Sequence, residues 1–554
     1  MFARDYKIRI FLVFGFFVLL FLVIIARLFL IQIHQKNFFK TLAQQQYELE
    51  IALTPARGIM YDRTKAVPLA FNHDVPSAFI IPNQLMEPEK TKRFLKKQYP
   101  AVYKRLLAHP EKCFLWVDRK LDKKTDETLK NRELKDLHFV AEPQRYYPFS
   151  SDVQLVGLVD IDNVGTAGLE LAFSKHLCGS PSDIIFQKDA RSGLFYFNKV
   201  VRRQGKTPES LTLSLDNTFQ AFAYEALKGS VQELKAKSGG CVVMDADTGH
   251  ILALANYPSY DPTKKGKNSL ESLKNNAVCE CYELGSVMKT FCAMAAIEEG
   301  VVGLDDLIDC EGRYAVVDGV KVENPTITLL NHLAANNNKI SFADVLSYSS
   351  NVGIAKVAKR LGPKFYTHLR RLGFGTKTGI QFPGERDGFI NPPNRWSRPS
   401  VIVMSFGYEM MVSLVQLAKA FSIIANGGYD VTPTLLLDSE RPASPKKLYK
   451  DTTIEQMKTV LGRVSKKVPI PGYDVMGKTG TARCVKNGRY SAQHHLYSFA
   501  GIVEKPGYRR VVVTFIREPD CGRNGLWASD VALPLFKRVA QSMVVRDMIS
   551  EVTV

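Results

Sequence analysis

Residues 241–254 read CVVMDADTGHILAL, two short apolar runs on either side of a polar turn that contains Gly249. Apolar runs of this length around such a turn predict a β-hairpin. Two more strands are expected at Ser498–Val503 and Arg510–Ile516, followed by an amphipathic helix at about Ala532–Val545. Strands, many helices, then strands and a closing helix predict an α/β domain with one sheet between helical layers.

The sequence before this domain predicts smaller elements. Residues 35–56 are polar and rich in Gln, which is compatible with a helical stalk. Short strands and turns are expected up to about residue 205, with a charged helical insert near 86–136. Ser210–Leu215 alternates polar and apolar residues as a strand does, and Asp216 and Asn217 are both placed to cap a helix that begins near Thr218.

A serine and a lysine one helical turn apart are the first candidates for chemistry. Ser286-Val287-Met288-Lys289 opens a helical run, and a spacing of three places the hydroxyl and the amine on one face. A lysine can act as base for a serine when burial or another cation lowers its pKa. A second S-x-x-K copy, at residues 444–447, contains a proline in polar surroundings and is interpreted as a loop.

Two further motifs follow in the chain. Ser349-Ser350-Asn351 precedes an apolar helix, where S-x-N alone is more often a helix cap. K-T-G occurs twice. Lys377-Thr378-Gly379 has loop-like surroundings and is expected to be structural, whereas Lys478-Thr479-Gly480-Thr481 is expected on a hairpin strand beside which a ligand backbone can lie. S-x-x-K, S-x-N and K-T-G in this order are the motif set of serine β-lactamases and penicillin-binding proteins.

One segment is apolar enough to cross a membrane. Ile10–Ala26 is uninterrupted apolar sequence, and about 20 such residues span a bilayer core. Arg4, Lys7 and Arg9 precede it, so the positive-inside rule keeps residues 1–9 in the cytoplasm. The run is long for a signal peptide and no small-residue cleavage site follows it. We therefore expect an uncleaved anchor at 10–33, with the remainder of the chain outside the cytoplasm.

Composition excludes several classes of protein. With 45% hydrophobic and 23% charged residues in 554, the chain is neither disordered nor a many-pass membrane protein. The net charge is +19, but the Lys-rich stretches Lys90–Lys97 and Arg119–Lys124 hold one aromatic residue and no nucleic-acid motif, so a solvated basic face is favoured. Nine scattered cysteines do not form a disulfide framework, and no zinc motif occurs. We expect neither metal nor cofactor.

Segments outside the three motifs resemble class B penicillin-binding proteins. The similar segments are Ala56–Arg63 (R-G-x-I-x-D-R), Arg145–Pro148 (R-x-Y-P), Gly168–Glu170 (G-L-E), Leu213–Gln220, Asp245–Leu254, Pro258–Pro262, Trp396-Ser397 and Ser405–Tyr408. Short linkers, the Val159–Asp162 segment and the absence of appended C-terminal repeats look most like the division-specific, FtsI-type branch, with the elongation branch as the alternative. Two places depart from the pattern: Glu283-Leu284-Gly285 stands where E-P-G is usual, and Ser192 of Asp189–Ser192 stands where Gly is usual.

The resemblance implies a D,D-transpeptidase that cross-links peptidoglycan stem peptides. The implied architecture is the transmembrane anchor, an elongated α+β pedestal domain at 34–205, a transpeptidase domain at 206–545 and a tail at 546–554. In the transpeptidase domain an antiparallel sheet would be sandwiched by helices, as in serine β-lactamases. The implied location is the bacterial inner membrane, with the catalytic domain in the periplasm.

The resemblance also implies residue roles. Ser286 would attack the D-Ala-D-Ala carbonyl, Lys289 would take its proton, Ser349 would relay a proton to the leaving D-Ala, and Asn351 would orient Lys289 and the substrate amide. The substrate-binding strand would be Lys478, Thr479, Gly480 and Thr481, with the backbone N–H groups of Ser286 and Thr481 as oxyanion hole. β-Lactams would acylate Ser286.

Partners and rival functions complete the expectations. A membrane glycosyltransferase and small division proteins are the expected partners, contacted through Arg57–Arg63 and the pedestal. The structural alternative is a turn fixed by an Arg57–Asp62 ion pair. The rival functions are a β-lactamase or β-lactam sensor, a D,D-carboxypeptidase that transfers to water, and a catalytically impaired division scaffold.

Overall fold

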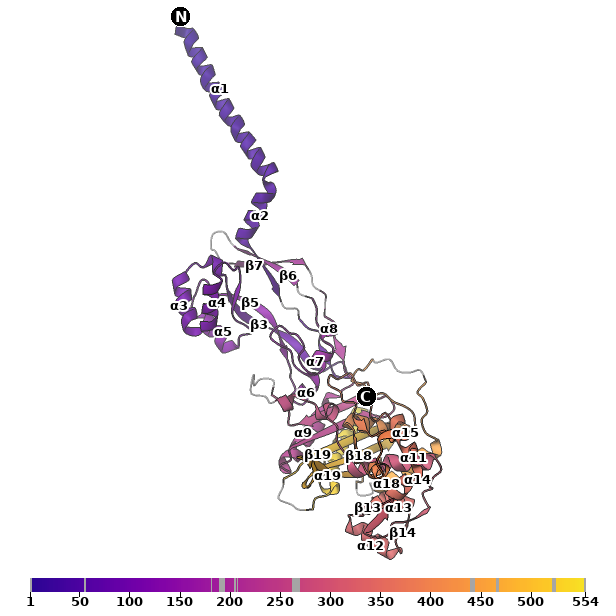
Figure 1. Ribbon diagram of the computed structural model, residues 1–554. Helices are drawn as coiled ribbons and strands as arrows, with labels where there is room; N and C mark the ends of the chain where they lie inside the picture. Colours follow the sequence, from indigo (N-terminus) through magenta and orange to yellow (C-terminus); the bar gives the residue numbers. More distant parts are fainter. Residues whose placement is uncertain are drawn as a thin grey trace. The chain divides into compact units, whose positions relative to one another are not determined.

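The computed structural model describes residues 2–53, 56–180, 182–188, 195–203, 206, 208–261, 270–438, 444–464, 468–520 and 525–552. The chain divides into two compact units (Figure 1). Unit 1 consists of residues 1–56, 73–144 and 179–208, and unit 2 of residues 57–72, 145–178 and 209–554. The expected turn at Asp189–Ser192 lies outside the described residues.

Unit 1 begins with the apolar helix α1, Phe2–Phe29, drawn in indigo in Figure 1. A π-helical turn at Leu30–His34 extends it, so that residues 6–34 form one helix long and apolar enough to cross a membrane. The polar helix expected at 35–56 is α2, which ends at Tyr47. It ends there because Glu48–Leu53 forms strand β1, which pairs antiparallel with β6, Ser182–Lys188. The third strand of this sheet is β7, Phe195–Arg203.

The charged insert expected near 86–136 is helical with one strand inside it. Its elements are α3 Pro88–Gln98, α4 Pro100–Ala108, β4 Leu115–Asp118 and α5 Lys123–Lys130. The helices bury Leu95, Val102, Leu106 and Leu129 against Ile80 of β3, and their charged residues face solvent. β3 spans Pro68–Ile80 and pairs with β4 and with β5, His138–Tyr146.

The main sheet of unit 2 is antiparallel throughout, in the order β10-β9-β19-β18-β17. The strands are β9 Ser238–Asp245, β10 Ile251–Tyr257, β17 Asp474–Lys486, β18 Arg489–Lys505 and β19 Tyr508–Arg517. The hairpin predicted at 241–254 and both C-terminal strands are confirmed. The first strand lies beside the last, with Met244 opposite Val511.

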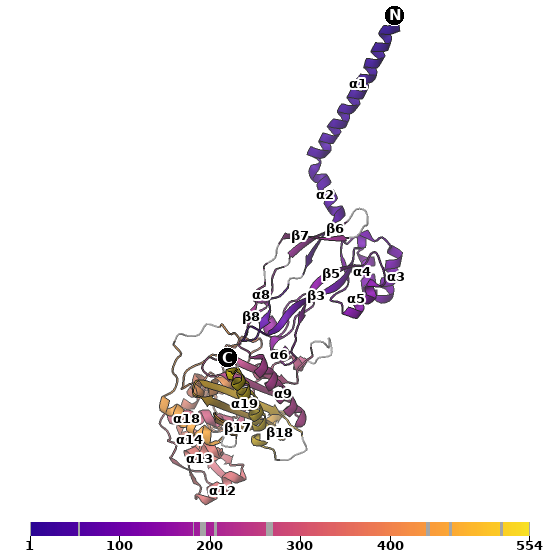
Figure 2. The same cartoon turned by 180° about the vertical axis from the view of Figure 1, so that it is seen from behind.

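Helices cover both faces of this sheet, as expected for the α/β domain. On one face α9, Asn217–Glu233, and α19, Ala528–Val552, pack on a core that includes Val243, Phe499 and Phe536 (Figure 2). Asp216 caps α9 by accepting hydrogen bonds from the backbone N–H groups of residues 218 and 219. α19 continues through the segment expected as a tail, up to Val552.

The other face is covered by helices that belong to the larger core. They are α10 Asn276–Cys279, α11 Lys289–Glu298, α13 Phe342–Ser347, α14 Asn351–Leu361, α15 Lys364–Arg371, α17 Leu414–Ala425 and α18 Asp451–Val464. The smaller elements around them are α6 Val153–Val156, α7 Gly168–Ala172, α8 Ser174–Leu177, α12 Ile327–Ala335, α16 Ser400–Ser405, β2 Met60–Tyr61, β8 Leu211–Thr212, β11 Leu307–Asp309, β12 Tyr314–Val317, β13 Val320–Glu323, β14 Lys339–Ser341, β15 Phe389–Ile390 and β16 Met410–Met411. The strand predicted at Ser210–Leu215 is thus only β8, which pairs in parallel with β2.

A buried ion network joins three of the similar segments inside unit 2. Both oxygens of the Glu170 carboxylate are paired, Oε2 with Arg57 Nε at 2.8 Å and Oε1 with Arg145 Nε at 2.6 Å. Arg57 also donates to the backbone carbonyls of Asn163, at 2.7 Å, and Glu170, at 3.0 Å. All three charged side chains are at most 1% exposed. The expectation that Arg57 contacts a partner protein is therefore wrong, because its guanidinium lies in the interior.

The alternative of a local Arg57–Asp62 pair is wrong as well. Asp62 accepts hydrogen bonds from the backbone N–H and the hydroxyl of Thr64, at 3.1 and 2.6 Å, and so closes a turn of its own.

Replacing Glu170 by Gln should destabilise unit 2, because two buried guanidinium groups lose the charge that neutralises them. Breaking a buried ion pair in this way costs about 3–5 kcal/mol, so the thermal unfolding midpoint should fall by several degrees. Glu89→Gln is the matched control, since Glu89 pairs with Lys92 on the surface and surface pairs contribute little. Equal midpoints for the two variants would contradict a stabilising role of the network.

Candidate active site

Ser286 lies in a 3₁₀ turn, Gly285–Met288, that leads directly into α11. Its side chain is half-buried and lines a cleft of about 720 Å³ together with Ser349, Asn351, Thr479 and Thr481. The three motifs therefore meet in one cleft, although they are spread over nearly 200 residues of the chain.

Two buried amines approach one hydroxyl oxygen beside Ser286. Lys289 Nζ donates to the Ser349 backbone carbonyl at 2.6 Å and to Ser349 Oγ at 3.0 Å, and Lys478 Nζ donates to the same Oγ at 3.0 Å. Burial, reinforced by the nearby Lys478 amine, lowers the pKa of Lys289 well below its usual value. Burial lowers the pKa of Lys478 to about 8. Two ammonium groups buried side by side would be strongly unfavourable. The arrangement therefore favours a neutral Lys289 amine next to a charged Lys478 amine.

The residues of the S-x-N motif divide between two tasks. Ser350 is the N-cap of α14, where its Oγ accepts from the backbone N–H of Gly353 at 3.0 Å. Ser349 adopts a left-handed conformation with φ +61°, and its hydroxyl oxygen accepts hydrogen bonds from the amines of Lys289 and Lys478. Asn351 lines the cleft and donates to the Glu323 carbonyl at 2.7 Å. Among the described residues no hydrogen bond joins Asn351 to Lys289, so in this structure Ser349 alone holds that amine.

The second K-T-G lies on β17, as predicted. Residues Lys478–Thr481 are in register with Tyr497–Ala500 of β18. Because β17 is the last strand in the sheet order, its outer edge pairs with no other strand that the structure describes, which is the kind of edge to which an extended ligand can add.

The other motif copies lie elsewhere. Lys377–Gly379 is in a loop, where the backbone N–H and the hydroxyl of Thr378 both donate to Glu385 Oε1 at 2.6 Å. The S-x-x-K copy at 444–447 is an exposed loop, also as predicted.

Three glycines allow the turn before Ser286 to touch its neighbours backbone to backbone. A Cβ on Gly480 would lie 2.3 Å from the Leu284 carbonyl oxygen, and one on Gly285 would lie 2.3 Å from the Thr481 carbonyl oxygen. On the other side of the turn, a Cβ on Gly407 would lie 2.3 Å from the carbonyl oxygen of Gly285. The turn that contains Ser286 is thus held between β17 and the 405–408 segment, with the backbone of Gly285 against that of Thr481.

Several cleft residues are absent from the motif prediction. Tyr408, Glu409, Arg483, Tyr490 and Trp527 line the cleft, and the rings of Tyr408 and Tyr490 meet edge to face at 5.3 Å. The Asn487-Gly488 turn predicts the hairpin that carries Tyr490. The position of Tyr490 at the cleft depends on how this hairpin packs on the rest of the domain, which the turn signal does not report.

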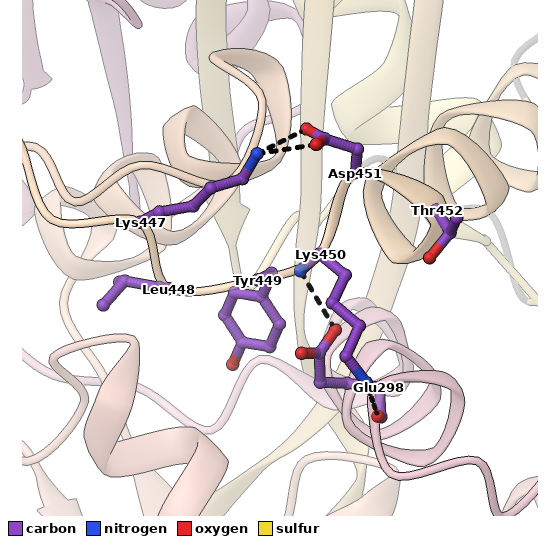
Figure 3. A pocket seen from close by; sticks show the side chains of 7 residues that line it. All are labelled: Glu298, Lys447, Leu448, Tyr449, Lys450, Asp451 and Thr452. Carbon is purple, nitrogen blue, oxygen red and sulfur yellow. Dashed lines mark hydrogen bonds and ion pairs between the residues drawn. The ribbon is translucent and has the colours of Figure 1, made fainter.

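A second, shallower pocket of about 600 Å³ lies at the opposite end of α11 (Figure 3). Its charged groups are paired: Lys447 with Asp451 at 2.7 Å, and Glu298 Oε2 with the backbone N–H of Lys450 at 3.2 Å. It contains no nucleophile beside a base, so the cleft at Ser286 is the candidate active site. The described residues contain no group of three or more His, Cys, Asp or Glu placed to hold a metal ion.

Family models match most of the chain. A model described as "Penicillin binding protein transpeptidase domain" matches residues 239–541, and one described as "Penicillin-binding Protein dimerisation domain" matches residues 52–213.

Curated relatives are similar over nearly the whole length. "Probable peptidoglycan D,D-transpeptidase PenA" of Neisseria gonorrhoeae is 30% identical over 94% of this chain and 89% of that protein. "Probable peptidoglycan D,D-transpeptidase PbpC" of Pseudomonas aeruginosa is 30% identical over 97% of this chain and 94% of that protein. "Peptidoglycan D,D-transpeptidase FtsI" of Escherichia coli is 29% identical over 78% of this chain and 72% of that protein.

Solved structures share the fold. Penicillin binding protein 3 of Mycobacterium tuberculosis, crystallised with aztreonam, has a TM-score of 0.66 at 24% identity, covering 90% of this chain and 98% of that one. The transpeptidase domain of penicillin-binding protein 3 of Burkholderia pseudomallei has a TM-score of 0.53 at 28% identity, covering 60% of this chain and 96% of that one.

Gly480→Ala should displace the turn before Ser286, because the new Cβ would collide with the Leu284 carbonyl oxygen. Overpacking of this kind costs about 1–3 kcal/mol. We expect a lower thermal midpoint and faster hydrogen exchange in the peptide that spans residues 284–288.

The control for this prediction is Gly462→Ala in α18, where the nearest contact to a Cβ is 3.7 Å. An alanine at a helical position without a collision should be neutral or stabilising by up to about 1 kcal/mol. If exchange at residues 284–288 were the same in both variants, the glycine contacts would not hold the turn.

Proposed function

Since the chain belongs to the class B penicillin-binding proteins and is a peptidoglycan D,D-transpeptidase, we propose that Ser286 is its nucleophile and Lys289 the base that activates it. The observation that carries this proposal is the fully buried Lys289 amine, one helical turn from Ser286 and hydrogen-bonded to Ser349. A lysine serves as a base near neutral pH only when its pKa is lowered, and here burial and Lys478 both act in that direction.

Acylation follows from this arrangement. Ser286 Oγ attacks the carbonyl carbon between the two D-Ala residues of a stem peptide, and its proton passes to Lys289 Nζ. The C–N bond then breaks, and the proton returns through the Ser349 hydroxyl to the amine of the departing D-Ala. Ser349 Oγ suits this relay because it lies 3.0 Å from the Lys289 amine and lines the cleft.

Binding and charge stabilisation are assigned to β17. The charged Lys478 amine and the hydroxyls of Thr479 and Thr481 would hold the terminal carboxylate of the substrate. The backbone N–H groups of Ser286 and Thr481 would donate to the oxyanion, since the contact at Gly285 holds the two backbones together. Asn351 would orient the substrate amide from the far wall of the cleft.

Deacylation by an acceptor stem peptide completes the cross-link. The amine of the acceptor attacks the Ser286 ester, an amide bond forms, and Ser286 recovers its proton through Lys289. Water in place of the amine would give the carboxypeptidase reaction. A β-lactam would acylate Ser286 in the manner of the dipeptide.

Cell division is the proposed setting, with the elongation role as the alternative. The named division-type relative, FtsI of Escherichia coli, supports it. The apolar helix that includes α1 supports a single-pass anchor in the inner membrane, and Arg4, Lys7 and Arg9 support a cytoplasmic N-terminus with the catalytic domain in the periplasm. A membrane glycosyltransferase and small division proteins are the proposed partners, and they would contact exposed residues of the pedestal rather than Arg57.

Ser286 is expected to be the only residue acylated by penicillin. Intact-protein mass spectrometry with a fluorescent penicillin should show one adduct on the wild type and none on Ser286→Ala. An adduct that persists in this variant, or that maps to Ser444, would overturn the assignment.

Lys478→Ala should abolish acylation, whereas Lys377→Ala should leave the rate close to that of the wild type, because Lys478 donates to the cleft residue Ser349 and Lys377 lies in a separate loop. Lys478 is charged below about pH 8 and neutral above it. Acylation of the wild type by a carboxylate-bearing penicillin should therefore decline as the pH rises through about 8. Equal losses in the two variants at matched folded content would refute the choice between the K-T-G copies.

The division role is tested in a strain depleted of its own division transpeptidase. The wild-type chain should restore septation and Ser286→Ala should not. Rescue of a strain depleted of its elongation transpeptidase, without rescue of division, would favour the alternative.

A further inference from the structure

The turn that presents Ser286 lacks the rigid residue usual at its centre. Leu284 stands where the resembled family has proline, and its φ of −101° lies outside the range that a proline ring allows. The chain before the turn is held by a backbone bridge, in which Tyr282 and Val412 exchange hydrogen bonds of 2.9 and 3.0 Å. Without a proline, the conformation of Glu283 and Leu284 depends on other contacts.

The Glu283 carboxylate is bonded to two other segments at this point. Its Oε1 accepts a hydrogen bond from the Tyr490 hydroxyl at 2.9 Å and another from the backbone N–H of Glu409 at 3.0 Å. Tyr490 lies on β18, at the start of the strand after the β17–β18 turn. Glu409 adopts a left-handed conformation with φ +55°. For a non-glycine residue this conformation is strained, and such strain is concentrated at functional sites.

A second contact runs parallel to the first. The Tyr408 hydroxyl accepts from the backbone N–H of Arg483 at 3.4 Å, and the Tyr408 ring meets the Tyr490 ring edge to face. The 405–412 segment and the β17–β18 hairpin are therefore joined beside the cleft, and the Glu283 side chain links both to the residues that lead into the Ser286 turn.

We propose that Glu283 is a positioning residue, which through its two hydrogen bonds fixes the Ser286 turn and the β17–β18 hairpin relative to each other. This inference rests on the proposed role of Ser286 as nucleophile. Glu283 touches neither substrate nor reacting atom in this role. It replaces the restraint that proline would give, because two hydrogen bonds to one carboxylate oxygen restrict the residue that precedes Leu284.

The expected effect is on rate rather than on folding. Hydrogen bonds to a charged acceptor are modest beside the total stability of a large unit, but a displaced nucleophile lowers the rate of attack directly. A residue with only a structural role would change stability and rate together.

The test measures the limiting acylation rate constant and the half-saturating concentration for a fluorescent penicillin, with the thermal midpoint for each protein. Glu283→Ala should lower the limiting rate constant about tenfold or more, with a smaller change in half-saturation and a midpoint close to that of the wild type. Glu283→Gln should keep most of the rate, because its amide oxygen can accept the same two hydrogen bonds. Tyr490→Phe should lie between wild type and Glu283→Ala. Tyr429→Phe, an exposed tyrosine that does not line the cleft, should match the wild type.

The outcomes separate this proposal from the one on which it rests. A wild-type rate in Glu283→Ala, or a Glu283→Gln rate as low as that of Glu283→Ala, would overturn the positioning role. If Glu283→Ala does not fold, Tyr490→Phe and Glu283→Gln decide the matter: wild-type acylation by Tyr490→Phe would refute the proposal. Failure of the proposed function would appear differently, as acylation that survives in Ser286→Ala.

Discussion

The cleft depends on two lysine amines that share the hydroxyl oxygen of Ser349 in a buried site. In water two ammonium groups at such distances repel each other weakly, but in the interior only one can keep its charge at an acceptable free energy. Burial lowers the pKa of both amines, and the nearby Lys478 lowers that of Lys289 further, so Lys289 is the amine that loses its proton first. Lys478 then keeps its charge, as the proposed binding of a substrate carboxylate requires. One arrangement thus suits both the proposed base and the proposed anion-binding group, provided that the surrounding core excludes water.

Backbone contacts, more than side-chain contacts, give this arrangement its precision. At Gly285, Gly407 and Gly480 a neighbouring backbone segment lies so close that a single methyl group on the glycine would collide with it. Side chains change rotamer within nanoseconds, whereas a backbone packed against backbone on both sides can move only if a strand moves. These backbone contacts and the hydrogen bonds of Glu283 therefore act together to hold the turn before Ser286 against β17.

Local patterns in the sequence predict part of this structure. The hairpin at 241–254, the C-terminal strands and the choice between the two K-T-G copies follow from periodicity and turn residues, because those signals act over a few positions. The Arg57–Glu170 pair and the contacts of Glu283 join residues more than a hundred positions apart, and no local pattern reports such pairs. For the same reason the burial of Arg57 could not be anticipated. Its position between the anchor and the catalytic domain suggested a partner contact, and only the fold places Glu170 beside it. The helix α19 extends beyond the amphipathic stretch expected at Ala532–Val545 at both ends, from Ala528 to Val552, with Pro534 inside it.

The strand order has a consequence for how the chain reaches its native state. β9 and β10 are made early and β19 is made near the end, yet β9 pairs with β19 in the middle of the sheet. Until the last strands have emerged, the early hairpin carries an unpaired apolar edge, and this is the kind of surface that recruits other extended chains. Assembly of the sheet is therefore non-local and slow. A truncation that removes β19 leaves the sheet without its centre.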